Sequence, residues 1–197
     1  MSTATAVLQN ENIPIFCDVN KDDYCLDPQD LKRKINKKTK AIILVHFAGN
    51  VCEINPILKI AKKNKIKIIE DCAQSHGSKY KNKKVGSFGD ISCFSFYATK
   101  HMTTGEGGIL CFQNKKYNLI AKKFRNHGLK NRDEHEMLGF NYRMNEIAGI
   151  MGNVQLKSLD KINKKRIDNS IKIIKELNKI KQNWFQTQPT KPNTLHT

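Results

Sequence analysis

The chain has 197 residues, 39% of them hydrophobic and 8% aromatic, which is enough for one sizeable core and excludes disorder of the whole chain. Its longest apolar runs, such as residues 41–45, are too short to span a bilayer. The first residues show neither the basic start nor the apolar stretch of a secretory signal. We therefore expect a cytoplasmic protein with no membrane partner.

The net charge of +17 raises the question of nucleic-acid binding. Only five of the 35 basic residues are Arg, and the Lys residues are spread over the whole chain. Reading of base edges and bidentate phosphate contacts favour Arg, and no helix-turn-helix, RRM or zinc-finger pattern is present. We therefore expect no nucleic-acid partner, although a basic nucleic-acid-binding module stays as an alternative. The charge can also steer phosphorylated substrates toward the protein.

The six cysteines form no CxxC pair, and most of them lie inside apolar runs. This pattern predicts reduced, small core residues rather than disulfides. No set of Cys and His has the spacing of a zinc site, so we expect no metal.

Apolar runs predict five strands, and the segments between and after them predict four helices. The strands are expected at 13–19, 41–47, 67–71, 91–97 and 107–113. The helices are expected at 27–35, 55–65, 116–128 and 145–180, the last as one long helix or two joined ones. The alternation of strands and helices predicts an α/β fold, with a mostly parallel sheet flanked by helices and joined by right-handed crossovers.

Two of these helices carry start signals. Asp27 is suited to be an N-cap before Pro28, and Asn55 is suited to the same position before Pro56. At the other end of the chain, residues 186–197 are a polar, Pro-containing tail without a closing element.

Chemically versatile residues follow two neighbouring strands. Asp71 ends one predicted strand, and Lys100 lies in the turn after the strand that carries Ser95. Ligands in such sheets bind beyond the carboxyl ends of the strands. A pyridoxal phosphate site needs a Lys amine for the cofactor aldehyde, a carboxylate for the pyridinium nitrogen and hydroxyl groups for the phosphate. From these residues alone, a surface lysine, a solvated strand-end acid and an ordinary tight Gly turn at 105–108 remain alternatives.

Longer stretches of the sequence carry a resemblance to a known family. They are PIFCDV (14–19), TKAIILVHFAG (39–49), IIEDCAQSHGSKYKNKKVGSFGDISCFSFYATK (68–100), TTGEGG (103–108), RNHG (125–128) and GFNYRMNEIAGIMGNVQL (139–156). In order and approximate spacing they resemble the sugar-nucleotide aminotransferases of the DegT/DnrJ/EryC1/StrS family. That resemblance covers most of residues 1–170 and implies the fold of PLP-dependent transferases of fold type I.

The resemblance implies roles for five residues. Lys100 matches the Schiff-base lysine, which also moves the substrate proton, and Asp71 matches the partner of the pyridinium nitrogen. Gln74 matches the residue beside the phenolic oxygen of the cofactor, and Ser95 matches a phosphate-binding hydroxyl. Asn141 matches an asparagine that reaches the phosphate across a dimer interface, which implies a homodimer with shared active sites.

Four further residues are weaker candidates. His46 and His76 follow strand ends near the expected site and are candidates for contact with cofactor or substrate, and the alternative for both is a buried histidine satisfied by the core. Arg143 is a candidate for a substrate phosphate or carboxylate, or for an interface salt bridge. His101 stands where the family more often has Asn; relatives with His in place of the lysine are dehydratases, but Lys100 is retained here.

The resemblance also implies the domain organisation and the activity. Residues 1–150 are expected to be a PLP-binding large domain that lacks its N-terminal part, and 151–197 a long helix leading into a largely missing small domain. The chain is thus expected to be a fragment, truncated at both ends. The implied activity is transfer of an amino group, from glutamate by analogy, to a nucleotide-linked keto sugar in polysaccharide, O-antigen or glycoconjugate biosynthesis. The alternative is a catalytically silent family member or fragment.

Overall fold

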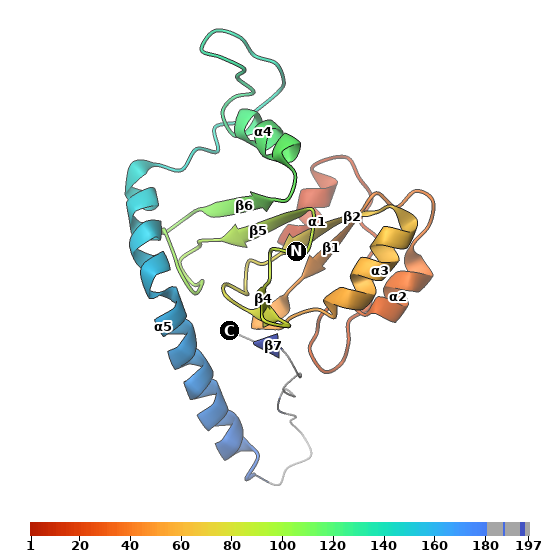
Figure 1. Cartoon of the computed structure of the whole chain (residues 1–197), viewed down its shortest axis with the longest axis vertical. Helices are drawn as coiled ribbons and strands as arrows, with labels where there is room; N and C mark the ends of the chain where they lie inside the picture. Colours follow the sequence, from red (N-terminus) through yellow and green to blue (C-terminus); the bar gives the residue numbers. More distant parts are fainter. Residues whose placement is uncertain (181–186, 188–193, 196–197) are drawn as a thin grey trace.

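A four-stranded sheet lies at the centre of the computed structural model, which describes residues 1–180, 187 and 194–195. Its strands are β1 (Ala41–Val45), β2 (Lys67–Asp71), β5 (Ile91–Ser95) and β6 (Gly108–Phe112), in the order β1-β2-β5-β6 (Figure 1). The pairs β1–β2 and β2–β5 are parallel, whereas β5–β6 is antiparallel. The predicted α/β fold with a mostly parallel sheet is therefore confirmed.

Two helices that precede and follow β1 pack side by side next to the parallel strands (Figure 1). In α2 (Pro28–Lys34), the side chain of Asp27 accepts hydrogen bonds from the backbone N–H groups of Gln29 and Asp30, as the sequence predicts. The next helix is α3 (Ile54–Asn64). Buried side chains of both helices, of β1 and β2 and of the adjoining loops form the main core, which contains Cys25, Leu31, Ile42, Leu44, Cys52, Ile57, Ala61, Ile66 and Ile68.

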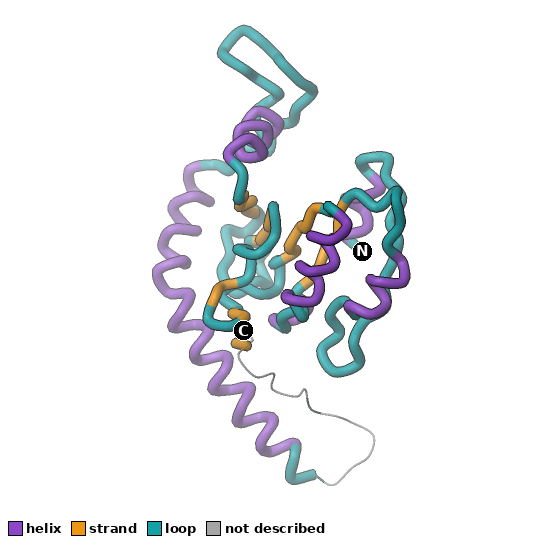
Figure 2. Tube along the Cα trace, turned by 45° about the vertical axis from the view of Figure 1, so that its right-hand side comes forward, coloured by secondary structure: helices purple, strands orange, loops and turns teal. Residues whose placement is uncertain are grey.

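Two further helices and a second, small sheet lie outside the four-stranded sheet. Helix α4 (Lys115–Phe124) follows β6, and α5 (Glu146–Leu177) is a single helix of 32 residues along one side of the molecule (Figures 1 and 2). A small antiparallel sheet pairs β4 (Lys83–Lys84), β3 (Lys79–Tyr80) and β7 (Thr194–Leu195). The remaining elements are α1 (Ser2–Leu8) and the short 3-10 turn η1 (Phe47–Gly49). The tail expected at 186–197 lies mostly outside the described residues.

Three local predictions are wrong. Residues 13–19 form no strand, because only Val19 makes a β-bridge, to Leu26, and Ile13 and Phe16 are 84% and 70% exposed. Asn55 is not an N-cap, because α3 begins at Ile54 and Glu53 precedes it without a side-chain cap. The helix expected at 116–128 already ends at Phe124.

Gly128 instead lies in the turn that follows α4. Its φ is +71°, and a Cβ there would lie 1.7 Å from the carbonyl oxygen of Met137. Only glycine allows this close approach. It lets residues 126–141 fold back on themselves, with Asn126 bridged to Asn141.

All six cysteines are free thiols. Cys25, Cys52 and Cys72 are buried, as predicted, but Cys111 on β6 is exposed, so the prediction that it is a core residue is wrong. Among the described residues, the structure contains no helix long and apolar enough to cross a membrane.

Candidate cofactor site

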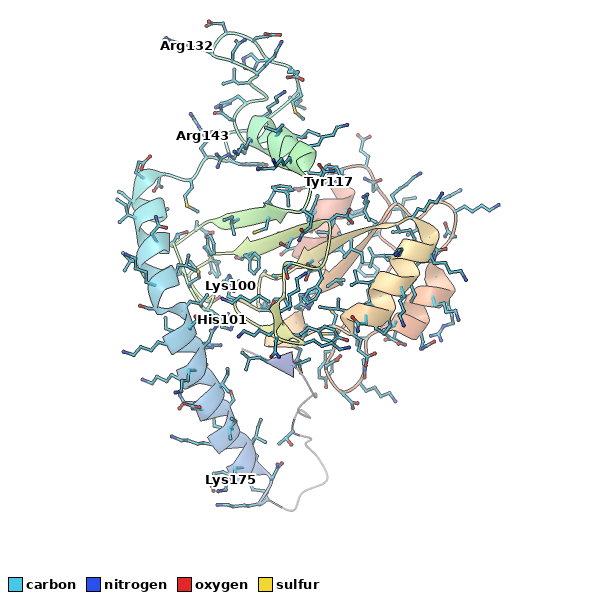
Figure 3. The ribbon with its side chains drawn as sticks, in the orientation of Figure 1. Lys100, His101, Tyr117, Arg132, Arg143 and Lys175 are labelled. Carbon is cyan, nitrogen blue, oxygen red and sulfur yellow. The ribbon has the colours of Figure 1, made fainter. Side chains whose placement is uncertain are left out.

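The parallel pairing of β2 and β5 brings the predicted acid and lysine segments to one edge of the sheet. Asp71, the last residue of β2, is in register with Cys93 of β5. Two residues later β5 ends at Ser95, and Lys100 lies in the turn that follows, beside α5 (Figure 3). The backbone N–H of Lys100 donates to the carbonyl oxygen of Tyr97, which closes this turn. The site therefore lies at the carboxyl ends of neighbouring parallel strands, where such sheets bind ligands.

Asp71 is half-buried and held on both carboxylate oxygens. Oδ2 accepts a hydrogen bond of 2.8 Å from Thr3 Oγ1 on α1, and Oδ1 accepts one of 3.1 Å from the backbone N–H of Ala73. A carboxylate has about four acceptor positions, so it can accept a further N–H from a ligand. Burial first and the nearby charge of Asp71 second raise the pKa of the Cys93 thiol to about 11. Cys93 is thus held as a neutral thiol beside this carboxylate.

The side chain of Lys100 is partly exposed, and its ammonium makes no hydrogen bond or ion pair with any described residue. The hydroxyl of Ser95 accepts a hydrogen bond of 3.3 Å from the backbone N–H of Tyr97, and its own proton is available to a ligand. Gln74 turns its Oε1 toward the loop after β1, where it accepts a hydrogen bond of 2.7 Å from the N–H of Ala48. Its amide N–H₂ group remains as a donor.

His76 lies beneath the turn that carries Lys100. Its Nε2 is 2.8 Å from the carbonyl oxygen of Ser95, and its ring is 5.4 Å from the ring of His101, centroid to centroid. Burial lowers the pKa of His76 to about 4, with smaller contributions from His101 and Lys100. His76 is therefore neutral at pH 7, and its side chain supports the chain beneath the site.

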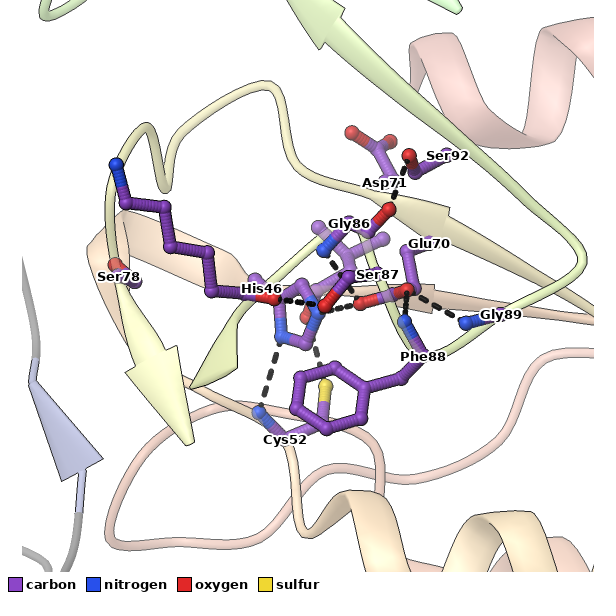
Figure 4. A network of polar contacts seen from close by, with 12 residues as sticks. His46, Cys52, Glu70, Asp71, Ser78, Gly86, Ser87, Phe88, Gly89 and Ser92 are labelled. Carbon is purple, nitrogen blue, oxygen red and sulfur yellow. Dashed lines mark hydrogen bonds and ion pairs between the residues drawn. The ribbon is translucent and has the colours of Figure 1, made fainter. Parts of the chain in front are cut away.

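His46 is fully buried and belongs to a polar network inside the core (Figure 4). Its Nδ1 accepts a hydrogen bond of 3.2 Å from the backbone N–H of Cys52 and so carries no proton. The ring proton is therefore on Nε2, which donates to Glu70 Oε2 at 3.1 Å. With both nitrogens used inside the chain, the geometry favours the alternative of a satisfied core histidine.

Glu70 is a residue that the sequence analysis did not single out. Its carboxylate is fully buried and accepts three backbone N–H bonds of 2.7–2.8 Å, from Gly86, Phe88 and Gly89, besides the bond from His46. Burial alone would raise the pKa of Glu70, but these four hydrogen bonds together outweigh it and lower the pKa. The signal in the sequence was the pair Glu70–Asp71 at a strand end, because neighbouring strand residues point to opposite faces and one of two acids must face the core.

Three ligand-type atoms, from His46, Glu70 and Cys72, lie within 4.8 Å of one another. Both carboxylate oxygens of Glu70 already face backbone N–H donors. A cation would have to displace them, and burial raises the pKa of the Cys72 thiol far above its usual range, so that it stays protonated. The chemistry of this cluster thus favours a satisfied carboxylate over a metal centre.

Asn141 and Arg143 lie elsewhere, in the exposed segment between α4 and α5. The Arg143 Nε donates to Asn141 Oδ1 at 3.0 Å. In Figure 3 the side chain of Arg143 lies near α4, well apart from Lys100. Within one chain the structure therefore gathers Asp71, Gln74, Ser95 and Lys100, and leaves this pair at another surface.

The donors and acceptors at the sheet edge fit pyridoxal phosphate. They offer an amine that makes no hydrogen bond or ion pair with the residues that the structure describes, a carboxylate with spare acceptor positions and a serine hydroxyl. A Lys amine and an Asp carboxylate are the groups with which PLP-dependent enzymes hold the cofactor aldehyde and the pyridinium nitrogen.

Comparison with known proteins agrees with this class. The sequence matches the DegT/DnrJ/EryC1/StrS aminotransferase family over residues 1–197, and the chain belongs to that family. It is 37% identical over 188 residues to GDP-perosamine synthase of Escherichia coli O157:H7, covering 89% of this chain and 52% of that protein. It is 36% identical over 170 residues to UDP-4-amino-4,6-dideoxy-N-acetyl-beta-L-altrosamine transaminase of Helicobacter pylori, covering 84% and 45%.

Among solved structures, an aminotransferase from Psychrobacter cryohalolentis superposes with a TM-score of 0.92 at 29% identity, over 99% of this chain and 54% of that one. The chain thus spans about half the length of the relatives it matches. The family and its structural neighbours are PLP-dependent, so the predicted cofactor and the resemblance noted in the sequence are both confirmed.

Proposed function

We propose that this chain forms the cofactor-binding part of an aminotransferase that transfers an amino group, from glutamate, to a nucleotide-linked keto sugar. The observation that carries the proposal is Lys100, retained in the turn after β5 with an ammonium that no described residue engages. The names of two relatives, a GDP-sugar synthase and a UDP-sugar transaminase, support a nucleotide sugar as the acceptor. The setting that follows is cytoplasmic synthesis of sugars for surface polysaccharide, including O-antigen.

Bound pyridoxal phosphate would supply an electron sink that stabilises negative charge at the carbon from which a proton is removed. With pyridoxal phosphate bound, Asp71 would hold a proton on the ring nitrogen, and the Ser95 hydroxyl would donate to the phosphate. Gln74 would donate its amide N–H to the phenolic oxygen. The amine of Lys100 would hold the cofactor and would carry the proton taken from the substrate.

The Lys100 amine acts as a nucleophile and as a base only in its neutral form. Closure of the site over the substrate, which excludes water, is the role we assign to chain segments from a second copy.

A homodimer with shared sites is supported by the exposed apolar side chains near Asn141 and Arg143. They extend over α4, the segment 124–144 and the first turns of α5, in the upper part of Figure 1. We call this group the apolar face; it consists of Leu119, Ile120, Phe124, Leu138, Phe140, Tyr142, Met144, Ile147, Ile150, Met151 and Val154. Patches of this extent mark protein interfaces, and a second copy would bring Asn141 to the phosphate of its neighbour.

The test of the function is amine transfer from glutamate to GDP- and UDP-linked keto sugars, followed by mass spectrometry of the sugar product. Lys100→Ala should lower turnover by at least about 10³-fold, because both the nucleophile and the proton carrier are lost. Lys115→Ala on the exposed start of α4 is the control and should leave turnover unchanged. Equal turnover of Lys100→Ala and the parent chain would contradict the proposal.

A further inference from the structure

The buried network around Glu70 lies directly behind the candidate site. Glu70 and Asp71 are consecutive residues of β2, so their side chains point to opposite faces of the sheet. The carboxylate of Glu70 is fully buried, whereas that of Asp71 is half-buried and faces Thr3 of α1. A displacement of the backbone at Glu70 therefore also displaces Asp71, because the two residues are directly bonded.

Glu70 connects β2 to the turn that leads into β5. Its Oε1 accepts the N–H groups of Phe88 and Gly89, and its Oε2 accepts that of Gly86. The turn 86–89 leads through Asp90 into β5, the strand that carries Ser95 and leads to Lys100. The carboxylate thus fixes the start of the lysine-bearing segment relative to the strand of Asp71.

His46 connects the same strand end to the loop after β1. Its side chain donates to Glu70, and its backbone N–H donates to the carbonyl oxygen of Asp71 at 3.0 Å. Two residues further, the N–H of Ala48 holds Gln74 through its Oε1. One loop therefore positions both Asp71 and Gln74.

We propose that Glu70 and His46 are positioning residues, which hold the Asp71 carboxylate and the Gln74 amide in register with Lys100 from behind the sheet. This inference rests on the proposed function, because it concerns the same site. It goes beyond that function by assigning a role to two fully buried side chains whose hydrogen bonds are made within the chain. Hydrogen bonds to a buried charge hold geometry better than neutral ones, which is why a carboxylate is suited to this position.

Variants can separate positioning from stability. His46→Leu keeps the volume but removes both ring hydrogen bonds, whereas His46→Gln can still accept from Cys52 and donate to Glu70. Every hydrogen-bond partner of the Glu70 carboxylate is an N–H donor. Glu70→Gln replaces one acceptor oxygen by an amide N–H₂ group, which would face these donors and could not accept their hydrogen bonds. Leu31→Ala in α2 is the matched control, since it lowers stability from a core position whose side chain makes none of the hydrogen bonds of this network.

The first readout is the bound cofactor, measured by its visible absorption and by titration of the chain with pyridoxal phosphate. We expect His46→Leu and Glu70→Gln to weaken cofactor binding by about 10-fold and to shift the pH at which the absorption band changes, because Asp71 no longer sits at the ring nitrogen. His46→Gln should restore both properties toward those of the parent chain. Leu31→Ala should lower the melting temperature and leave both unchanged.

The second readout needs no cofactor. Amide hydrogen exchange of the chain alone should become faster at residues 71–76 and 86–89 in His46→Leu, and not in Leu31→Ala. If exchange at residues 71–76 and 86–89 were unchanged in His46→Leu, or increased equally in Leu31→Ala, the positioning role would be overturned. This outcome would hold regardless of the cofactor-binding result. If the parent chain did not bind pyridoxal phosphate, that result would contradict the proposed function. The positioning role of His46 and Glu70 would then be tested by hydrogen exchange alone.

Discussion

The parallel half of the sheet and the region around α4 and the start of α5 differ in how far their side chains are buried and hydrogen-bonded within one chain. On β1, Leu44 is 1% exposed, and next to it the charged Glu70 finds four hydrogen-bond donors in the core. On the apolar face, Ile150 is 64% and Leu138 is 81% exposed. The core side chains of the first region are buried within one chain, whereas the second region presents the kind of surface that is covered by another polypeptide.

The largest expected effect of this difference is on stability. Leu44→Ala should lower the free energy of unfolding by about 3 kcal/mol, because it opens a cavity in the main core. Ile150→Ala should change it by less than about 0.5 kcal/mol in the monomer, because little of that side chain is buried. Urea unfolding at low protein concentration measures both values, and similar losses in the two variants would contradict the comparison.

The next effect is on self-association. Ile150→Asp should weaken dimerisation by about 100-fold, because an aspartate in the apolar face would lose its hydration when the face is covered. Lys175→Asp, near the far end of α5 in Figure 3, introduces the same residue away from the apolar face and should leave dimerisation unchanged. Sedimentation of the three proteins over a range of concentrations gives the dissociation constants. A parent chain that stays monomeric would remove the support for a shared site.

A smaller effect is expected in acid, within the parallel half. The folded state holds His76 with a pKa of about 4, below the usual 6.5, so the unfolded chain binds more protons between these values. Stability should therefore fall by roughly 2 kcal/mol as the pH is lowered from about 6.5 to about 4. His76→Gln, which keeps a donor for the Ser95 carbonyl but does not titrate, should show a flatter curve in that window.

Glu70 adds a second, more acidic window. Its pKa is lowered in the folded state, so its contribution is complete above the unfolded pKa of about 4.3 and is lost as the pH falls below that value. The remaining loss of stability in His76→Gln should therefore begin only below about pH 4.3. An unchanged slope between pH 6.5 and 4 in that variant would assign the transition to another group.

The smallest effect concerns the start of α5. Gly149 lies inside the helix, and a Cβ at this position would meet no atom within 4 Å. Gly149→Ala should therefore stabilise the chain by roughly 0.5–1 kcal/mol, through helix propensity alone. The effect of Gly149→Ala is measured in the Ile150→Asp variant, which stays monomeric. If Gly149→Ala lowered the stability there, this surface of α5 would already be covered by other residues of the same chain.

The sequence predicts the parallel half better than the rest of the fold. The cap at Asp27 and the buried strands β1 and β2 follow from local patterns, which depend on hydrophobic period and turn chemistry. Residues 13–19 have an equally apolar pattern but form no strand, because a strand needs a partner and the described residues offer only the bridge from Val19 to Leu26.

The site shows the same division. Asp71 and Lys100 follow from strand ends and from family resemblance, since both are marked by local sequence. The pairing joins His46, directly after β1, to Glu70 in β2, 24 positions further along the chain, and only the register of β1 against β2 brings them together. Their chemistry was visible in the sequence, but their contact was not, because register is set by packing of the whole sheet.

The central claim is that Lys100 anchors pyridoxal phosphate at the carboxyl ends of β2 and β5. It is tested most directly by incubating the chain with the cofactor, reducing with borohydride and locating the modified peptide by mass spectrometry, with Lys100→Ala as the control. The account predicts one modified lysine, Lys100, and no equivalent label in the control. Label scattered over surface lysines, equally in the two proteins, would contradict it.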